Sequence, residues 1–205
     1  MQLKVPVIGI LRGIRAEDFT PLMQAGFAAG LDGIEVTMNT HGAEEIIRAN
    51  RSQVPVGKFL GMGTIRNLAE AETALRAGAM FIVSPNVDQE VIAHARKKDI
   101  PIIAGALTPT EVYRAWTAGA VLIKVFPCRA LGGPHYIREL KGPFDHIPLM
   151  AVGGVTRSNA GAYFEAGAAA VGVGMSLFGE KDVQQKNWQA VARNVMQFIS
   201  QCPQV

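Results

Sequence analysis

Short apolar runs alternate with amphipathic segments along the whole chain. At three places the amphipathic segment ends in Ala-Gly-Ala, at Gly78, Gly119 and Gly167, and an apolar run follows. A glycine in that position is typical of a left-handed cap at the end of a helix. The apolar run after it is typical of a strand buried on both faces. Strands that alternate with helices predict a parallel sheet.

The alternation yields eight strand–helix units. The predicted strands span residues 5–11, 33–38, 58–63, 80–84, 100–105, 120–126, 147–152 and 169–174, and the predicted helices span residues 16–29, 42–52, 67–77, 88–98, 109–118, 134–141, 157–166 and 183–200. Eight such units predict one domain over residues 1–205, a single-domain (β/α)8 TIM barrel. A doubly wound sheet is the alternative, although Leu11-Arg12-Gly13 after the first strand is not its glycine-rich fingerprint.

The composition of the chain indicates which broad class of protein it belongs to. The chain has 205 residues, of which 49% are hydrophobic, enough for one sizeable core. No apolar run is long enough to span a membrane, and the first residues lack the layout of a signal peptide. Cys128 and Cys202 lie far apart, which suits a reducing, cytoplasmic location. A net charge of +3, spread along the chain, argues against a nucleic-acid partner.

Lys124 is the most unusual residue of the pattern, because it interrupts the apolar run of residues 120–127. Burying an unpaired ammonium group is costly. The lysine therefore pairs with a carboxylate, or it loses its proton and becomes a nucleophilic amine that can form a Schiff base. The alternative is a lysine on an edge strand whose ammonium reaches solvent.

Glu35 is the other ionisable residue within a predicted strand, residues 33–38. A carboxylate and an amine in one buried cavity suit acid–base and covalent chemistry. A structural ion pair in a non-catalytic binding barrel is one alternative. A phosphosugar isomerase or synthase, using both groups without a covalent intermediate, is another.

Chemistry in a (β/α)8 barrel lies at the carboxyl ends of the strands. The polar candidates at those ends are Arg12, Glu35, Thr37, Asn39, Thr64, Ser84, Pro85, Asn86 and Lys124. The backbone of Gly153, Gly154 and Gly174–Ser176, in the last two units, is a candidate phosphate site. Arg12 could hold a carboxylate or a phosphate, or could be a surface arginine in a loop. The four histidines have no metal-ligand spacing, and we expect a packing role for Cys128.

A series of motifs, one in each of several units, resembles one family. The motifs are Glu35-Val36-Thr37, Gly61-Met62-Gly63-Thr64, Ser84-Pro85, Lys124 with Phe126-Pro127, and Gly153-Gly154-Val155. In this order they resemble the class I 2-keto-3-deoxy-6-phosphogluconate (KDPG/KHG) aldolases, from about residue 5 to 200.

The resemblance implies a cytosolic (β/α)8 lyase that needs no metal or cofactor, assembles as a homotrimer and acts on a phosphorylated 2-keto sugar acid. It implies that Lys124 forms the Schiff base and that Glu35 is the general acid and base. Thr64 and Pro85 would line the pyruvate pocket, and the loops of Gly153-Gly154 and Gly174 would hold the phosphate.

Two positions depart from the gluconate-specific pattern, and a third departs from the family as a whole. Asn39 stands where that branch has arginine, and Val152 where it has threonine. Both resemble the 2-keto-3-deoxy-6-phosphogalactonate aldolases, whose substrate has the opposite configuration at C4, so a role in galactonate degradation is expected, with the gluconate compound as the alternative. Met175 stands where family members often have serine, and Ser176 follows it. The backbone amides can still bind the phosphate there, either alone or together with the hydroxyl group of Ser176.

Overall fold

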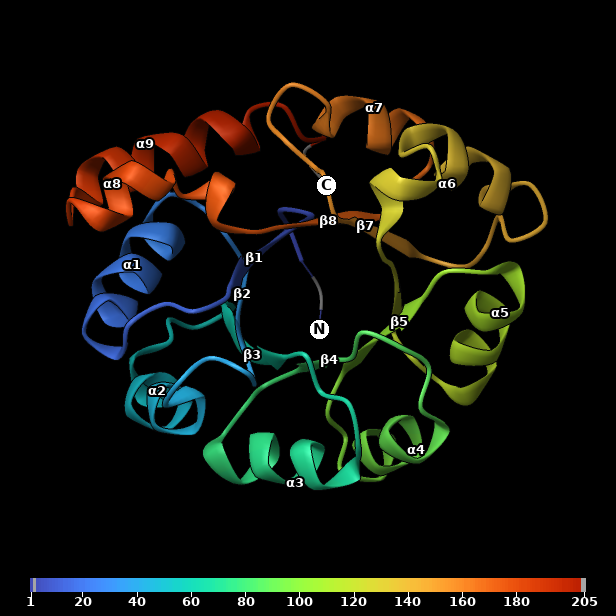
Figure 1. The fold of residues 1–205 in the computed structure, drawn as a ribbon, viewed down its shortest axis with the longest axis horizontal. Coiled ribbons are helices and arrows are strands. Elements are labelled where there is room, and N and C mark those ends of the chain that lie inside the picture. Colours follow the sequence, from blue (N-terminus) through green and yellow to red (C-terminus); the bar gives the residue numbers. More distant parts are fainter. Residues whose placement is uncertain (2, 204–205) are drawn as a thin grey trace.

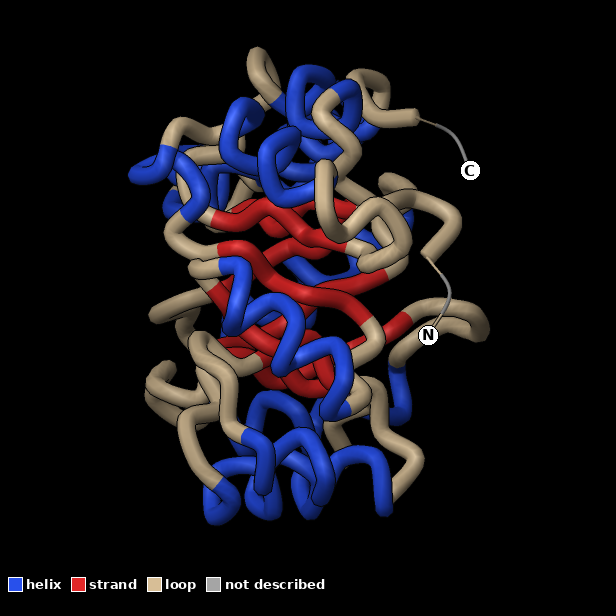
Figure 2. Tube along the Cα trace, turned by 90° about the vertical axis from the view of Figure 1, so that its right-hand side faces the viewer, coloured by secondary structure: helices blue, strands red, loops and turns tan. Residues whose placement is uncertain are grey.

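The computed structural model describes residues 1 and 3–203 and shows a closed barrel of eight parallel strands in chain order (Figure 1). The strands are β1 (Val7–Leu11), β2 (Gly33–Thr37), β3 (Phe59–Gly63), β4 (Ile82–Val83), β5 (Ile102–Ala106), β6 (Leu122–Val125), β7 (Leu149–Val152) and β8 (Ala170–Val173). Helices surround the barrel on the outside (Figures 1 and 2). The predicted (β/α)8 barrel is confirmed, and the doubly wound alternative is wrong.

The helices are α1 (Ala16–Ala28), α2 (Ala43–Asn50), α3 (Leu68–Ala77), α4 (Gln89–Lys97), α5 (Pro109–Ala118), α6 (Pro134–Lys141), α7 (Ala160–Glu165), α8 (Glu180–Gln184) and α9 (Trp188–Ile199). Three short 3₁₀ segments, η1 (Arg51–Gln53), η2 (Cys128–Leu131) and η3 (Met175–Leu177), join them to the rest. Local signals in the sequence set several of these ends. Thr108 and Glu111 form a capping box at the start of α5, and Gly119, at φ 105°, ends that helix in the left-handed conformation.

The last predicted helix, residues 183–200, is wrong as one piece. The chain turns between α8 and α9, because Lys186 adopts a left-handed φ of 55°. Asn187 then starts α9, its side chain accepting a hydrogen bond from the N–H of Ala190. The helix predicted over residues 157–166 begins only at Ala160, because Asn159 folds back to accept a hydrogen bond from the N–H of Thr156.

Two apolar clusters divide the interior. The larger one fills the space between the strands and the surrounding helices. The smaller one lies inside the barrel and consists of Ile8, Phe81, Val83, Ile103, Leu122, Met150, Val152 and Ala170. Met1 and Leu3 pack against this inner cluster from the amino-terminal end of the strands. The inner cluster closes that end, so polar groups inside the barrel are confined to the carboxyl end of the strands.

Across residues 1 and 3–203, none of the helices combines the length and the apolar character that crossing a membrane requires.

Candidate active site

Strand register carries Glu35 and Lys124 to the barrel interior. Glu35 lies opposite Ile10 on β1 and Gly61 on β3, and Lys124 lies opposite Gly105 on β5 and Met150 on β7. Alternate residues of a strand face the same side, so inward-facing positions recur in twos. Both side chains are buried, 1% exposed for Glu35 and 6% for Lys124. They line one cavity of about 610 Å³ at the carboxyl end of the strands.

Inward-facing glycines make room for this cavity. A methyl group at Gly63 would lie 2.5 Å from the carboxyl carbon of Glu35, and one at Gly105 would lie 2.2 Å from the carbonyl carbon of Pro85. Neither position can therefore carry a larger side chain without moving a group of the site. These spacers were missed from the sequence. The available signal was a glycine in phase with the inward-facing positions of β3 and β5.

The Glu35 carboxyl group is held in a low-polarity environment. Its Oε2 atom is buried and finds no hydrogen-bond partner among the described residues. Burial raises the pKa of Glu35 to about 7, and the positive charges of Lys124 and Arg12 partly oppose that rise. A carboxyl group with a pKa near neutrality exchanges protons readily in both directions, as a general acid and base must.

Lys124 experiences the same environment. Burial lowers the pKa of Lys124, the Glu35 carboxylate opposes the decrease, and Arg12 adds to it. Its Nζ atom lies 5.1 Å from the centroid of the Phe126 ring, a contact that favours the charged form. Burial is the largest of these influences, so the unprotonated, nucleophilic form of the amine is more accessible than in an exposed lysine.

The geometry removes two of the alternatives for this pair. The closed barrel has no edge strand from which Lys124 could reach solvent. Within the described part of the chain, no ion pair of 4.0 Å or less joins Lys124 to Glu35. Lys124 and Glu35 therefore face the same cavity without forming a direct ion pair. This arrangement does not fit a pair whose role is structural.

Arg12 forms the wall of the cavity at β1. Its Nη1 donates to Asn39 Oδ1 at 2.9 Å, and its Nη2 donates to Thr64 Oγ1 at 3.2 Å. Arg12 and Thr64 line the cavity, whereas Asn39 acts on it through Arg12. Two hydrogen bonds from neighbouring strands fix the guanidinium, so Arg12 is an oriented group and not a freely moving surface side chain.

The loop after β7 presents its amide groups to the cavity. Gly153 and Gly154 both have left-handed φ values, 94° and 82°. The Gly153 carbonyl accepts from the N–H of Arg129 at 3.1 Å, and the Gly154 carbonyl accepts from Asn159 Nδ2 at 3.0 Å. The N–H groups of Gly154 and Val155 have no acceptor in residues 1 and 3–203. Carbonyls that are already bonded and amides that are free form an arrangement suited to an anion.

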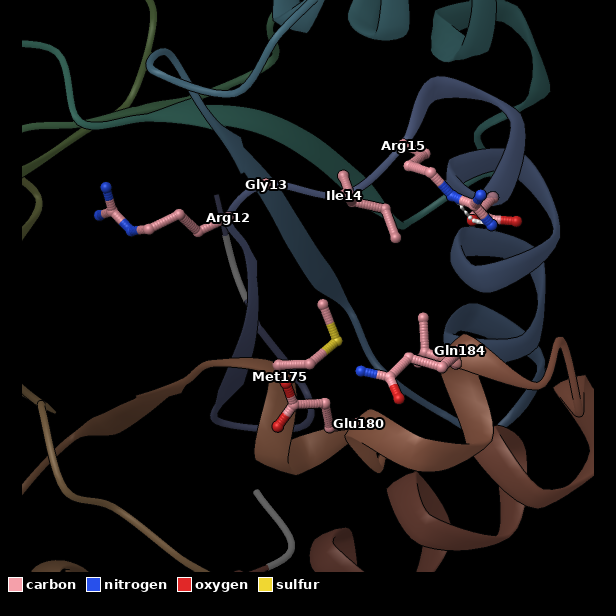
Figure 3. Close-up of a pocket in the computed structure, with 9 residues that line it drawn as sticks. Arg12, Gly13, Ile14, Arg15, Met175, Glu180 and Gln184 are labelled. Carbon is pink, nitrogen blue, oxygen red and sulfur yellow. Dashed lines mark hydrogen bonds and ion pairs between the residues drawn. The ribbon is translucent and has the colours of Figure 1, made fainter.

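Ten of the twelve predicted site residues line this one cavity: Arg12, Glu35, Thr64, Pro85, Lys124, Val152, Gly153, Gly154, Gly174 and Ser176. Met175 does not join them. It lines a neighbouring groove of about 450 Å³ with Ile14, Glu180 and Gln184, from which the Arg12 side chain points away (Figure 3).

The remaining candidates have structural contacts. Ser84 is buried, donates to the Asn86 carbonyl at 2.7 Å and accepts from the N–H of Gly105 at 3.3 Å, which holds the loop that carries Pro85. Cys128 is buried, and burial raises the pKa of its thiol to about 11, which agrees with a packing role. No group of three or more His, Cys, Asp or Glu in residues 1 and 3–203 could hold a metal ion.

The fold and the cavity define a (β/α)8 barrel with a buried lysine and a buried carboxyl group in one cavity at the carboxyl end of its strands. The pattern of the KDPG and KHG aldolase family matches residues 2–194, and the chain belongs to that family. It is thus an aldolase, a lyase of the Schiff-base class.

Two relatives and one solved structure refine the comparison. The chain is 36% identical to the 2-dehydro-3-deoxy-6-phosphogalactonate aldolase of Escherichia coli, over 93% of this chain and 94% of the relative. It is 35% identical to the 2-dehydro-3-deoxy-phosphogluconate aldolase of Treponema pallidum, over 78% and 76%. It is also similar to the KDPG aldolase of Legionella pneumophila solved with pyruvate captured as a covalent carbinolamine, at TM-score 0.85 and 28% identity, covering 94% of this chain and 93% of that one.

Proposed function

We propose that this protein cleaves 2-dehydro-3-deoxy-6-phosphogalactonate to pyruvate and glyceraldehyde 3-phosphate through a Schiff base on Lys124. The observation that carries the proposal is one cavity that holds a buried, weakly basic lysine, a carboxyl group with a pKa of about 7 and a loop of free amides. The amine supplies the nucleophile, the carboxyl group moves protons, and the amides receive an anionic group.

In the proposed reaction the Lys124 amine attacks the C2 ketone of the substrate. The carbinolamine that forms loses water and becomes an iminium ion, which withdraws electrons from C3. Glu35, acting through a water molecule, removes the proton of the C4 hydroxyl group. The C3–C4 bond breaks, its electron pair enters the iminium system as an enamine, and glyceraldehyde 3-phosphate leaves. Protonation of the enamine at C3 and addition of water then release pyruvate and regenerate Lys124.

The substrate ends are assigned by the charges of the cavity walls. We place the pyruvate portion between Thr64, Pro85 and the guanidinium of Arg12, which can pair with a carboxylate. The phosphate would lie at the opposite wall, against the amides of Gly154 and its neighbours and against Gly174 and Ser176. This places C2 and C4 of an extended substrate between Lys124 and Glu35.

The choice of the galacto epimer rests on Val152 and Asn39. Val152 is buried and lines the cavity. It packs closely against Gly172: a methyl group added to that glycine would lie only 2.8 Å from the Cγ2 atom of Val152. A methyl group there cannot hydrogen-bond to a substrate hydroxyl, whereas a threonine could, and a site built for such a bond discriminates strongly. Asn39 orients Arg12 instead of placing a second guanidinium near the cavity. The gluco epimer is the alternative substrate, with the same chemistry.

Steady-state cleavage of both epimers tests the proposal, with pyruvate release coupled to lactate dehydrogenase. We expect kcat/KM to favour the galacto compound by about 10-fold or more. A preference for the gluco compound would show that Val152 and Asn39 do not set the C4 preference in this protein. Release of pyruvate from neither compound would remove the proposed reaction and leave a phosphosugar isomerase or synthase.

The proposal includes a homotrimer in the cytoplasm. The stacked pair of Tyr113 and Phe144, with ring centroids 6.3 Å apart and Tyr113 54% exposed, offers apolar surface for a contact between subunits. Sedimentation velocity is expected to show one species with three times the mass of the chain. A monomer at micromolar concentration would contradict the proposed trimer but would leave the proposed reaction unaffected.

A further inference from the structure

Arg129 lies directly behind the loop that we assign to the phosphate. It belongs to η2, five residues after Lys124, and its N–H donates to the Gly153 carbonyl at 3.1 Å. Its side-chain stem covers Gly154, because a methyl group on Gly154 would lie 2.4 Å from Arg129 Cδ and 2.6 Å from its Cβ. The absence of a side chain at residue 154 thus permits this arginine to lie flat against the loop.

The positive charge of Arg129 is not neutralised by any residue that the structure describes. Within the described part of the chain, its guanidinium takes part in no ion pair and donates no hydrogen bond to a side chain or carbonyl. Its charge acts on the phenol of Tyr163, whose pKa it lowers against the stronger effect of burial, and it has no anionic partner there. Arg129 is exposed and its stem lies against Gly154, so its unpaired guanidinium is accessible to an anionic ligand at the loop.

Arg129 is also connected to the cavity through shared walls. It lines a groove of about 500 Å³ together with Gly132, Asn159 and Tyr163. Gly154 and Thr156 line both this groove and the cavity of Lys124 and Glu35. An anion at the N–H group of Gly154 would therefore lie at the border between the two spaces, next to the groove that Arg129 lines.

Among the residues that the structure describes, the charged side chains that line the cavity are Arg12, Glu35 and Lys124. The Arg12 guanidinium is bonded to Asn39 and Thr64, which follow β2 and β3, and not to the loop after β7. Met175 adds no donor, because its thioether faces the other groove (Figure 3). A phosphate dianion held by amides alone would keep both of its charges uncompensated.

We propose that Arg129 is a specificity-determining residue that binds the substrate phosphate beside the Gly153-Gly154 loop. The inference rests on the proposed function and deepens it, because it assigns the recognition of the phosphorylated substrate class to a side chain. Arg129 supplies the positive charge that balances the phosphate, and the N–H groups of the loop fix the orientation of the phosphate oxygens. It takes no part in Schiff-base chemistry.

The test is the kinetics of Arg129→Gln on 2-keto-3-deoxy-6-phosphogalactonate and on the same sugar acid without phosphate. Loss of one charge-assisted contact predicts a KM for the phosphorylated compound that is about 10-fold to 100-fold higher, with kcat within about 2-fold. The constants for the unphosphorylated compound and the trapping of pyruvate by borohydride are expected to stay unchanged. Arg129→Lys, which keeps the charge, should recover part of the lost affinity.

Arg138→Gln is the matched control, since it removes the same charge from an exposed position on α6. Equal KM values for Arg129→Gln and Arg138→Gln, with an active wild type, would overturn the role of Arg129 and leave the proposed function intact. Equal losses on both substrates, or loss of pyruvate trapping, would also overturn it, because Arg129 would then only support the loop. A wild type that cleaves neither compound would remove the proposed function itself.

Discussion

The two walls of the cavity achieve their chemistry in different ways. The wall formed by β2, β3 and β6 places ionisable side chains, Glu35 and Lys124, among glycine spacers inside a closed barrel. The wall after β7 and β8 presents the free N–H groups of Gly154 and Val155, in a loop where Gly153 and Gly154 have left-handed φ values. Burial changes the proton affinity of the first wall, whereas backbone direction determines what the second wall can bind.

This contrast assigns separate tasks to the two walls. Groups whose pKa is shifted toward neutrality suit the making and breaking of bonds. Fixed amides suit the binding of an anion that does not react. Substitutions in the first wall should therefore change kcat and imine formation, and substitutions in the second wall should change KM for the phosphorylated substrate.

The largest effect is expected for Lys124→Met. Without the amine no Schiff base forms, so kcat/KM should fall by about 10⁴-fold or more. Stability should be retained or should increase, because a buried amine is replaced by an apolar side chain of similar length. Kinetics together with chemical denaturation checks both statements. Activity retained within about 10-fold would remove the covalent mechanism.

Glu35→Gln should lower kcat by about 10²-fold to 10⁴-fold, because the amide cannot exchange a proton. It should also change how stability depends on pH. The folded state raises the pKa of Glu35 from 4.5 to about 7, so the folded protein binds this proton more tightly than the unfolded chain. The stability due to this group is then fully present below pH 4.5 and is lost as the pH rises through 7.

The size of that linkage can be measured by denaturation at a series of pH values. Between about pH 4.5 and pH 8 the wild type should lose about 3 kcal/mol of stability relative to Glu35→Gln. A constant difference between the two proteins over this range would show that the Glu35 carboxyl group is not held in the environment described here.

Gly63→Ala should damage the first wall without removing any ionisable group. The new methyl group would lie 2.5 Å from the Glu35 carboxyl carbon, so the carboxyl group must move. We expect kcat to fall by about 10²-fold. Gly161→Ala on α7 is the control, because its methyl group would approach nothing closer than 3.9 Å. Equal kcat values for the two variants would show that the position of Glu35 is not critical.

Gly154→Ala should produce the smallest effect and should affect the second wall alone. A side chain at φ 82° is strained, and its methyl group would displace the stem of Arg129. We expect KM for the phosphorylated substrate to rise by about 10-fold, while pyruvate still forms its imine with Lys124. A variant that loses imine formation as well would show that the two walls are not separable.

The sequence predicted the first wall better than the second. A lone lysine or glutamate in an apolar strand is a local signal, and eight repeated units place both residues at one end of a barrel. The spacers at Gly63 and Gly105 were missed because their meaning depends on which side chain lies across the strand pair. The hydrogen bonds of Arg12 to Asn39 and Thr64 join residues 27 and 52 positions away, which no local pattern shows.

Single backbone angles explain the remaining differences. The split between α8 and α9 depends on one left-handed residue, Lys186, within a continuous helical stripe. Met175 was grouped with the site because of its place after Gly174, yet its side chain faces the neighbouring groove. Its direction follows from how η3 begins, at Gly174 with φ −76° and ψ −151°, which the sequence does not specify.

Reduction of the protein with borohydride in the presence of pyruvate tests directly whether Lys124 forms the Schiff base, with the modified residue located by peptide mass spectrometry. We expect one reduced pyruvate adduct per chain, on Lys124, that is absent without pyruvate and absent in Lys124→Met. An unmodified Lys124, or an adduct on another lysine in a protein that still cleaves its substrate, would contradict this role of Lys124.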